Sequence, residues 1–279
     1  MRSVPIDPIY RARAGHATLC SVELHLAATY RRIVEASTER VWENVRDWEH
    51  LPWLHASSFS SIDFEEGGHW GWRSGLGIRL PGGRIVRSRL ELVIDDAGEG
   101  DRYVSRTIEG SGAGTEIWTR VEPQTAHRTK VEVEFHLPEE RPAELAALGV
   151  GYTRLYTQLW DEDEAMMQGR EAQLRRPRRL ASKEGEERRV SLGPVEALRK
   201  RLPHRFEIEG RSFRIVEVDG ELLAHSTVCP HFLGPLQTAS ESAGELECPW
   251  HGYRFDGRTG RSCDGRNLRL ESAPRVEVD

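Results

Sequence analysis

Apolar and polar residues alternate with a period of two along much of the region between Ser57 and Leu137, and glycines interrupt the alternation. Such alternation is typical of strands in a sheet with one buried face, because successive side chains of a strand point to opposite faces. The pattern predicts an antiparallel meander of five or six strands, from the stretches 60–64, 69–73, 85–94, 102–109, 115–122 and 129–137. A further strand is expected near 21–34.

Helical patterns stand on both sides of the predicted sheet. After the first strand, Ser37 or Thr38 can cap a helix, and Pro52 is expected to end that helix. A much longer helix is expected over residues 142–174, because a proline opens the stretch and another proline follows it. The predicted order is therefore strand, short helices, several strands and a long helix.

The segment that follows is strongly basic. Residues 174–201 contain ten Lys or Arg and four Glu, a net charge of +6, and show little apolar periodicity before Val195. We expect a linker there, either a solvated connector or a docking surface for an acidic redox partner. Residues 202–279 resemble short strands joined by turns, as in a small all-β domain. The predicted fold class is α+β, with a helix-and-sheet domain over 20–173.

Composition limits the function classes that fit the chain. Its 279 residues are 38% hydrophobic and 30% charged, which fits two globular domains and not a disordered chain. A formal charge of −6 argues against nucleic acid as the main partner. No apolar run approaches the roughly 20 residues of a membrane span, and the polar start lacks the apolar core of a signal peptide. We therefore expect a cytoplasmic protein without a membrane span.

The four cysteines are too few to staple a chain of this length, so they indicate chemistry. Cys229-Pro-His231 is followed, sixteen residues later, by Cys248-Pro-Trp-His251. Two Cys and two His can bind a structural zinc ion, but zinc fingers keep the cysteines in one pair and the histidines in the other. One of each in both halves suits a two-iron cluster, in which thiolates hold one iron and imidazoles the other.

CPHFLGPL at 229–236 and CPWHGYRFDGRTG at 248–260 resemble the two loops of a Rieske [2Fe–2S] domain, and the resemblance covers about 203–279. It implies that the cluster is held by Cys229, His231, Cys248 and His251. It also implies that Gly234-Pro235-Leu236 shields the cluster and that Tyr253 hydrogen-bonds a cysteine sulfur. Cys20 and Cys263 lie outside both motifs, and we expect no ligand role for either.

A second candidate metal site lies in the first domain. Asp47, His50 and His55 form the pattern D-x2-H-x4-H, and the break expected at Pro52 lets the two imidazoles converge. A site with two histidines and one carboxylate for non-haem iron(II) needs a further acid. Asp163 is the acidic exception in an apolar stripe of the long helix, formed by Leu159, Trp160, Met166 and Met167. A buried carboxylate must be paired or coordinated, so Asp163 is the expected third ligand, with Glu162 in reserve and Glu164 expected in solvent.

The order of elements resembles the helix-grip fold of the START/Bet v 1-like superfamily, and the motif resembles the catalytic domain of Rieske non-haem iron oxygenases. This resemblance implies that His50, His55 and Asp163 bind a mononuclear Fe(II) and that Asp47 bridges to a Rieske histidine. Asn44 is one position closer to Asp47 than the family asparagine, and it receives no role. The domain order is the reverse of the usual oxygenase.

The resemblance implies an oxygenase that uses O2 and electrons from a ferredoxin or a flavin-dependent NAD(P)H reductase on a hydrophobic small molecule, in a family that usually forms trimers. The competing hypothesis is a non-catalytic fusion of a lipid- or polyketide-binding helix-grip domain with a Rieske electron carrier. Several tryptophans can line an apolar pocket or belong to the core: Trp48, Trp53, Trp70, Trp72 and Trp118. Six histidines stand singly and are expected to bind no metal: His25, His69, His127, His136, His204 and His225.

Overall fold

The computed structural model describes residues 23–95, 101–176, 189–238, 240–242 and 244–277, and Cys20 lies outside these ranges. The chain divides into two compact units, Met1–Glu164 and Ala165–Asp279. The division falls within the long helix α3, Pro142–Leu174. Among the helices of the described residues, none combines the length and the apolar character that a membrane crossing needs.

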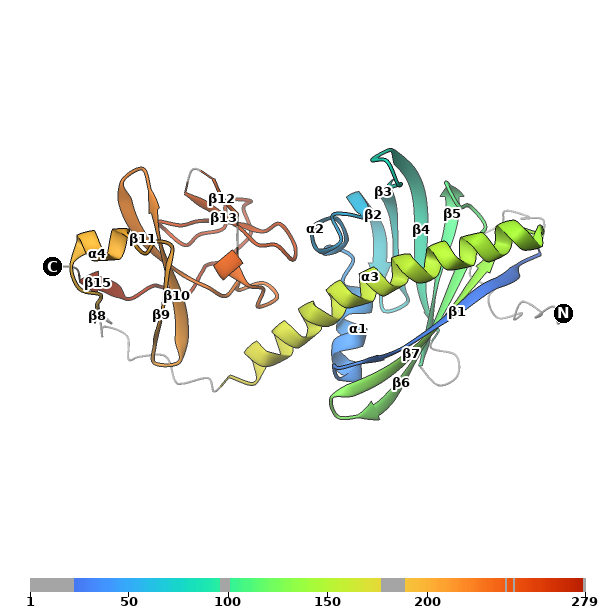
Figure 1. Ribbon diagram of the computed structural model, residues 1–279, viewed down its shortest axis with the longest axis horizontal. Coiled ribbons are helices and arrows are strands. Elements are labelled where there is room, and N and C mark those ends of the chain that lie inside the picture. Colours follow the sequence, from blue (N-terminus) through green and yellow to red (C-terminus); the bar gives the residue numbers. More distant parts are fainter. Residues whose placement is uncertain (1–22, 96–100, 177–188, 239, 243, 278–279) are drawn as a thin grey trace. The chain divides into compact units, whose positions relative to one another are not determined.

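The first unit is built on an antiparallel sheet in the order β1-β7-β6-β5-β4-β3-β2 (Figure 1). Consecutive strands from β2 to β7 are neighbours, as in a meander. The first strand, β1, pairs with the last strand of the sheet, β7. The strands are His25–Val34 (β1), Phe59–Gly68 (β2), Gly71–Arg79 (β3), Ile85–Asp95 (β4), Arg102–Gly110 (β5), Glu116–Thr125 (β6) and Arg128–Leu137 (β7). The predicted antiparallel meander is confirmed.

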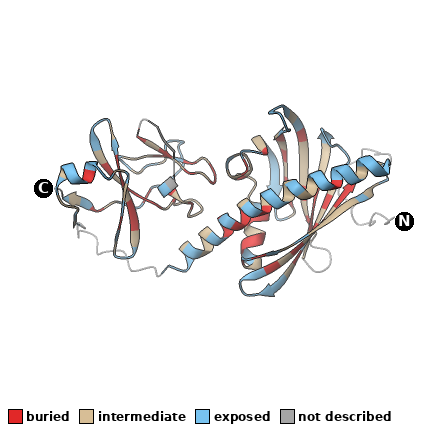
Figure 2. Cartoon of the chain, viewed as in Figure 1, coloured by how far each residue is buried: buried red, intermediate tan, exposed pale blue. Residues whose placement is uncertain are grey.

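The alternation in the sequence follows from the single buried face of this sheet. On β7, Val131, Val133 and Phe135 are completely buried, whereas the intervening Glu132 and Glu134 are half-buried. Buried positions recur in the same way along the neighbouring strands (Figure 2). Two faces of different polarity fix the register, because a shift by one residue would turn every apolar side chain outward.

The helix α3 covers the buried face of the sheet. The rings of Tyr152 and Tyr156 pack on Phe135 of β7, with centroid distances of 5.3 and 4.9 Å. Near the start of α3, a Cβ atom on Gly149 would lie 2.5 Å from the carbonyl oxygen of Ala27, so the close approach of helix and β1 requires glycine there. A long helix held against a curved antiparallel sheet is the helix-grip arrangement, and the predicted α+β fold class is confirmed.

Two short helices, α1 (Thr38–Arg46) and α2 (Leu51–Leu54), connect β1 to β2. The Ser37 hydroxyl caps α1 by accepting a hydrogen bond from the backbone N–H of Arg40. Val41 and Val45 of α1 are buried, so this helix contributes to the core of the first unit.

The prediction that Pro52 ends the first helix is wrong. The helix α1 already ends at Arg46, and Pro52 lies in the first turn of α2. A proline is tolerated there because the N–H that it lacks would have no partner within the helix. Asp47 and His50 therefore do not share a helix face. Instead they flank the turn between α1 and α2.

The second unit contains several small sheets. One consists of β9 (His204–Ile208), β10 (Arg211–Val218) and β11 (Glu221–Ser226), and another of β12 (Ser240–Ser242), β13 (Glu245–Glu247) and β14 (Arg254–Asp256). The strands β8 (Arg189–Ser191) and β15 (Arg275–Glu277) pair in parallel, and the short helices are α4 (Val195–Arg199) and η2 (Leu236–Thr238). Phe213 and Ile215 of β10 are buried at the centre of this unit.

Part of the basic segment is folded and packs within the second unit. Residues 189–201, which the charge pattern places in a linker, include β8 and α4. Leu198 of α4 is completely buried against Phe206 and Phe213, and Val190 of β8 packs on the same cluster. The linker prediction is wrong for these residues because it relies on the high net charge of the segment and gives little weight to its few apolar residues. Residues 177–188 of the expected linker lie outside the described ranges.

Candidate metal centres

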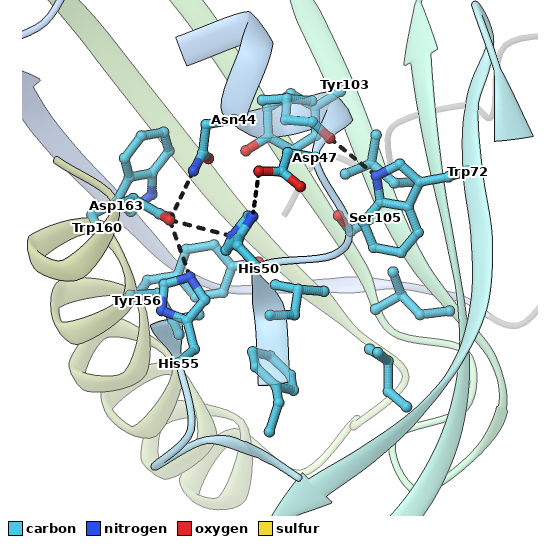
Figure 3. A pocket seen from close by; sticks show the side chains of 17 residues that line it. Asn44, Asp47, His50, His55, Trp72, Tyr103, Ser105, Tyr156, Trp160 and Asp163 are labelled. Carbon is cyan, nitrogen blue, oxygen red and sulfur yellow. Dashed lines mark hydrogen bonds and ion pairs between the residues drawn. The ribbon is translucent and has the colours of Figure 1, made fainter. Parts of the chain in front are cut away.

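The helix α2 brings the two histidines of the D-x2-H-x4-H motif together. His50 precedes its first residue and His55 follows its last, and the backbone N–H of Leu54 donates to the His50 carbonyl at 2.8 Å. The imidazole rings lie 5.1 Å apart at an angle of 72° (Figure 3). Both rings are buried, with 3% and 1% of their residues' surface exposed.

Asp163 of α3 lies between the two imidazoles. Its Oδ1 atom is 3.4 Å from His50 Nε2 and 3.1 Å from His55 Nε2. One ligand atom from each of the three residues falls within 4.8 Å of the other two. Asp163 is 8% exposed, as its place in an apolar stripe suggests. The structure thus brings together the three residues that the sequence analysis expects at the mononuclear iron.

The outer nitrogen of each histidine faces another carboxylate. Glu162 Oε2 lies 2.5 Å from His55 Nδ1, and Asp47 Oδ2 lies 3.5 Å from His50 Nδ1. A carboxylate at Nδ1 favours a proton on that nitrogen and leaves Nε2 for a metal. Glu162, the reserve ligand, therefore contacts the side of His55 that is turned away from Asp163.

Sequence reasoning missed the contribution of Asn44. Its Nδ2 donates a hydrogen bond of 2.9 Å to Asp163 Oδ1, and Asn44 itself is buried in α1. The bond holds the carboxylate in place while one lone pair remains for a cation. Asn44 precedes Asp47 by three positions, but its burial and its contact with Asp163 depend on the folded domain and cannot be predicted from neighbouring residues.

One acid next to Asp163 is buried although the sequence analysis expects it in solvent. Glu164, which the sequence places in solvent, is 8% exposed. Its carboxylate pairs with Arg32 of β1 and accepts a hydrogen bond of 2.8 Å from the backbone N–H of Glu35. A cation from a distant strand thus permits burial of a second carboxylate on α3.

The charges at the first centre are strongly coupled. Burial lowers the pKa of His50, but hydrogen bonds to the carboxylates of Asp163 and Asp47 outweigh burial and raise this pKa to about 10. For Asp163, burial raises the pKa, and the two histidines reverse the effect and bring the pKa well below its usual value. Without a metal, the imidazolium of His50 neutralises the carboxylate of Asp163.

The donor set fits a metal ion. Two ligands about 2.1 Å from a metal and roughly at right angles to one another lie about 3 Å apart. The distances from Asp163 Oδ1 to the two Nε2 atoms are close to that separation. Two imidazoles and one carboxylate are also the ligand set of non-haem iron(II) sites with open coordination positions.

A cavity of about 130 Å³ adjoins this centre within the first unit, between the sheet and the helices α1, α2 and α3 (Figure 3). Trp72 and Trp160 are the tryptophans on its wall. The indole N–H of Trp72 donates to the Val45 carbonyl at 3.0 Å, which leaves an apolar ring surface toward the cavity. Of the five tryptophans that the sequence suggested for a pocket, only Trp72 lines this one.

The second candidate centre is formed by two loops of the second unit. In the first loop, the N–H of Leu233 donates to the Cys229 carbonyl, and the N–H of Cys229 donates to Gly234 at 2.9 Å. In the second loop, the N–H of Gly252 donates to the Cys248 carbonyl at 2.8 Å. These bonds fold each loop around its own cysteine.

The four side chains expected at the cluster converge. Cys229, Cys248 and His251 are buried, and the rings of His231 and His251 lie 4.7 Å apart at 88°. A hydrogen bond between the two sulfurs lowers the pKa of the Cys248 thiol and raises the pKa of the Cys229 thiol. Backbone N–H groups of neighbouring residues also point at both sulfurs and favour thiolate, the form that binds iron.

The loops leave little space around the sulfurs. A Cβ atom on Gly234 would lie 2.8 Å from Cys248 Sγ and 3.1 Å from the Trp250 ring, so the shielding segment has to pass the sulfur without a side chain. The Tyr253 ring stacks on His231 at 4.0 Å. Cys263 is exposed, and its thiol takes no part in the convergence. The donor set and the closed loops fit a [2Fe–2S] cluster.

Comparison with known proteins supports an iron–sulfur domain in the second unit. A family model, Rieske [2Fe-2S] domain, matches residues 188–273. The chain is 36% identical over 55 residues to the ferredoxin component of a naphthalene 1,2-dioxygenase system from Pseudomonas aeruginosa, covering 20% of this chain and 53% of that protein. It is 39% identical over 69 residues to the ferredoxin component of a p-cumate 2,3-dioxygenase system from Pseudomonas putida, covering 24% and 54%.

An oxygenase component is also similar over this region. Dicamba O-demethylase from Stenotrophomonas maltophilia is 35% identical over 68 residues, which cover 22% of this chain and 20% of that protein. The chain thus spans about half the length of the ferredoxin relatives and a fifth of the oxygenase component.

Solved structures resemble the first half of the chain. A START superfamily protein from Mycobacterium smegmatis has a TM-score of 0.40 and 16% identity, covering 50% of this chain and 97% of that one. The Zhui aromatase/cyclase from Streptomyces sp. R1128 has a TM-score of 0.42 and 15% identity, covering 53% and 96%. Taken together, the two cysteine loops and the family match over 188–273 identify the C-terminal part of the chain as a Rieske [2Fe–2S] domain.

Proposed function

We propose that the chain is a Rieske-type oxygenase, which uses O2 and electrons from an external reductase to hydroxylate, demethylate or desaturate a hydrophobic small molecule. The observation that carries the proposal is the convergence of His50, His55 and Asp163 beside a cavity, in a chain with a Rieske domain. Similarity of that domain to the oxygenase component of dicamba O-demethylase favours the same function.

The residues divide the work between two centres. His50, His55 and Asp163 would hold a mononuclear iron, while Cys229, His231, Cys248 and His251 would hold the cluster. When bound, the iron supplies the activation of O2 and the cluster supplies single electrons.

The remaining polar residues of the first centre orient these ligands. Asp47 and Glu162 keep a proton on each Nδ1, and Asn44 fixes the carboxylate of Asp163. The cavity places mainly apolar side chains beside these ligands. We also propose that Asp47 is the link to a Rieske histidine, as the sequence resemblance implies.

The partner follows from the Rieske domain. A Rieske cluster exchanges electrons with another redox protein, and a ferredoxin or a flavin-dependent NAD(P)H reductase is the proposed donor here. The hydrophobic character of the substrate is inferred from the apolar side chains of the cavity. The cytoplasmic location and the homotrimer stay predictions.

Counting iron tests the proposal. The full chain, loaded under anaerobic conditions, should contain three irons, two in the cluster and one at the first centre. The double substitution His50→Ala/His55→Ala should remove one iron and leave the visible absorption of the cluster unchanged. His69→Ala is the matched control, because His69 is exposed in a turn, and this variant should keep all three irons.

Two irons in a fully loaded wild-type protein would contradict the oxygenase. That result would favour the non-catalytic fusion of a ligand-binding helix-grip domain with an electron carrier. A third metal ion other than iron, bound by the same residues, would also contradict the proposal.

A further inference from the structure

The cavity beside His50, His55 and Asp163 bounds the molecules that this chain can bind. Its volume is about 130 Å³. An apolar cavity of about 150 Å³ in another protein accommodates benzene, so this cavity matches a single six-membered ring. The wall is built mostly from large side chains of a packed sheet and helix, so a fused ring system or a long acyl chain would have to extend out of the cavity into solvent: Leu76, Leu90, Leu92, Tyr103, Tyr156 and Trp160.

The charge of the wall gives a second limit. Among the described residues that line the cavity, two are acidic, Asp47 and Asp163, and none is Lys or Arg. The imidazole rings of His50 and His55 face these acids and are already paired with them, so a carboxylate or sulfonate substituent would be buried beside acids without a cation of its own, which is strongly unfavourable. The far wall consists of leucines and aromatic rings and offers no carboxylate for an ammonium group. The wall thus favours an uncharged ligand.

One polar group on the sheet side of the cavity has no protein partner. Ser105 of β5 lines the cavity and is 9% exposed, and no hydrogen bond joins its hydroxyl to any part of the chain that the structure describes. Its oxygen is not among the completely buried side-chain atoms without a partner, so the hydroxyl is accessible from the cavity and can hydrogen-bond a molecule there, either water or a ligand. Figure 3 shows Ser105 on the sheet, across the cavity from the His55 and Asp163 end.

Tyr103 lies two residues before Ser105 on the same face of β5 and also lines the cavity. Burial raises the pKa of its phenol, and the charge of Asp163 adds to the rise. The phenol therefore stays protonated, and the sheet side of the cavity carries two neutral hydroxyl groups. Neutral hydroxyl groups recognise a ligand hydroxyl or carbonyl group.

We propose that this cavity binds an uncharged molecule of one six-membered ring that bears a hydroxyl or carbonyl group, hydrogen-bonded to Ser105. The ring lies against Leu90, Leu92 and Trp72, and the rest of the molecule faces the histidines. This inference rests on the proposed function in treating the ligand as the substrate, but the binding itself does not require iron.

Binding of four probes to the full chain tests the proposal. Phenol has the expected ring, charge and hydroxyl; toluene lacks the hydroxyl, benzoate carries a charge and 1-naphthol adds a ring. Trp72 and Trp160 line the cavity, so their fluorescence reports binding, and calorimetry gives the affinities. We expect phenol to bind at least about tenfold more tightly than each of the other three probes.

Substitution of the serine gives the specific test. Ser105→Ala should weaken phenol about tenfold, the effect of one lost hydrogen bond in a buried site, and should leave toluene unchanged or slightly tighter. The matched control is Ser74→Ala. Ser74 is a completely buried serine of β3 whose hydroxyl has no partner in the described chain, but Ser74 does not line the cavity. Its replacement should leave both affinities unchanged.

The outcomes separate this inference from the oxygenase proposal. Equal affinity for benzoate or 1-naphthol, or an unchanged phenol affinity in Ser105→Ala, would overturn the inference whatever the iron content is. The wild-type probe series decides the size and charge limits even if a variant fails to fold. If the protein holds two irons and phenol still binds as expected, the oxygenase fails and the ligand class stands.

Discussion

The two candidate metal centres are encoded in different ways. In the second unit, all four expected cluster ligands fall within residues 229–251, on two loops that are closed by their own backbone hydrogen bonds. In the first unit, Asp163 follows His55 by 108 residues, and the six strands β2 to β7 lie between them in the sequence. One centre is therefore a property of local chain segments, and the other is a property of the folded domain.

This difference determines what can disturb each centre. The cysteine loops depend on tight turns and on one glycine that passes a sulfur, so small local changes should remove the cluster. The histidines and Asp163 depend on how α2 and α3 are held on the sheet, and their buried charges must balance each other. Variants that affect one centre and spare the other test the comparison.

The largest effect is expected from Cys248→Ala. Removing a buried thiolate ligand should abolish the cluster, with loss of its visible absorption and of two irons per chain. Because the mononuclear ligands lie in the other unit, the third iron should stay. Metal analysis and absorption spectra of the same sample measure both. Cys263→Ala is the control and should change neither, since that thiol is exposed and outside the loops. A colourless wild-type protein with bound zinc would contradict the cluster.

A pair of neighbouring acids on α3 should show effects of different size. Asp163→Asn removes a direct ligand and should lower the iron(II) affinity of the first centre by more than about 100-fold. Glu162→Gln removes only the acceptor at His55 Nδ1 and should cost about 10- to 100-fold. Competition with a chelator gives both affinities.

Circular dichroism checks that these two variants fold. A larger loss of iron(II) affinity in Glu162→Gln than in Asp163→Asn would contradict the assignment of Asp163, because Glu162 would then be the ligand. The cluster absorption should stay constant in both variants, as it depends only on the second unit.

Metal binding at the first centre should depend on pH. In the metal-free protein His50 is protonated up to a pKa of about 10, and its Nε2 must lose that proton to bind a metal. The apparent affinity should therefore rise about tenfold per pH unit below that pKa and level off above it. Chelator competition with cobalt(II) between about pH 6.5 and 8.5 measures the slope. A flat profile would show that His50 is neutral without metal.

Much of the fold could be predicted from the sequence because the sheet has one buried face. The alternation of Val131, Val133 and Phe135 with acidic residues marks β7 directly, and β6 alternates in the same way. The polar exception at Asp163 likewise stands out against an apolar stripe. Such features depend on nearest neighbours in the sequence, which is why a single sequence reveals them.

The remaining features depend on partners that are distant in sequence. The sequence around Glu164 suggests a solvent-exposed acid. Its side chain can be buried because Arg32 of β1 pairs with it. Asn44 gains its role from Asp163, on an element far along the chain. The turn at Asp47 replaces the expected continuous helix, because Pro52 opens α2 and does not end α1. No local pattern carries this information.

The smallest effect is expected from Arg266, which tunes the cluster from within its own unit. Its guanidinium lies 4.1 Å from the centre of the Tyr253 ring, and that ring stacks on His231 at 4.0 Å. A positive charge beside the ring that stacks on a ligand histidine favours the reduced cluster, although the nearby Asp264 and solvent offset part of its effect. Arg266→Gln should therefore lower the reduction potential, by about 20–50 mV, close to the 59 mV that corresponds to a tenfold change for one electron.

Protein-film voltammetry measures this shift, and Arg205→Gln, which removes an exposed guanidinium on β9, should leave the potential unchanged. High salt should reduce the difference between Arg266→Gln and the wild type, because Arg266 is partly exposed and its charge is screened. If the potential instead responds to substitutions in the first unit, such as Asp163→Asn, and not to Arg266→Gln, the cluster is not a property of its own loops. The contrast between a locally encoded centre and a domain-encoded centre would then be lost.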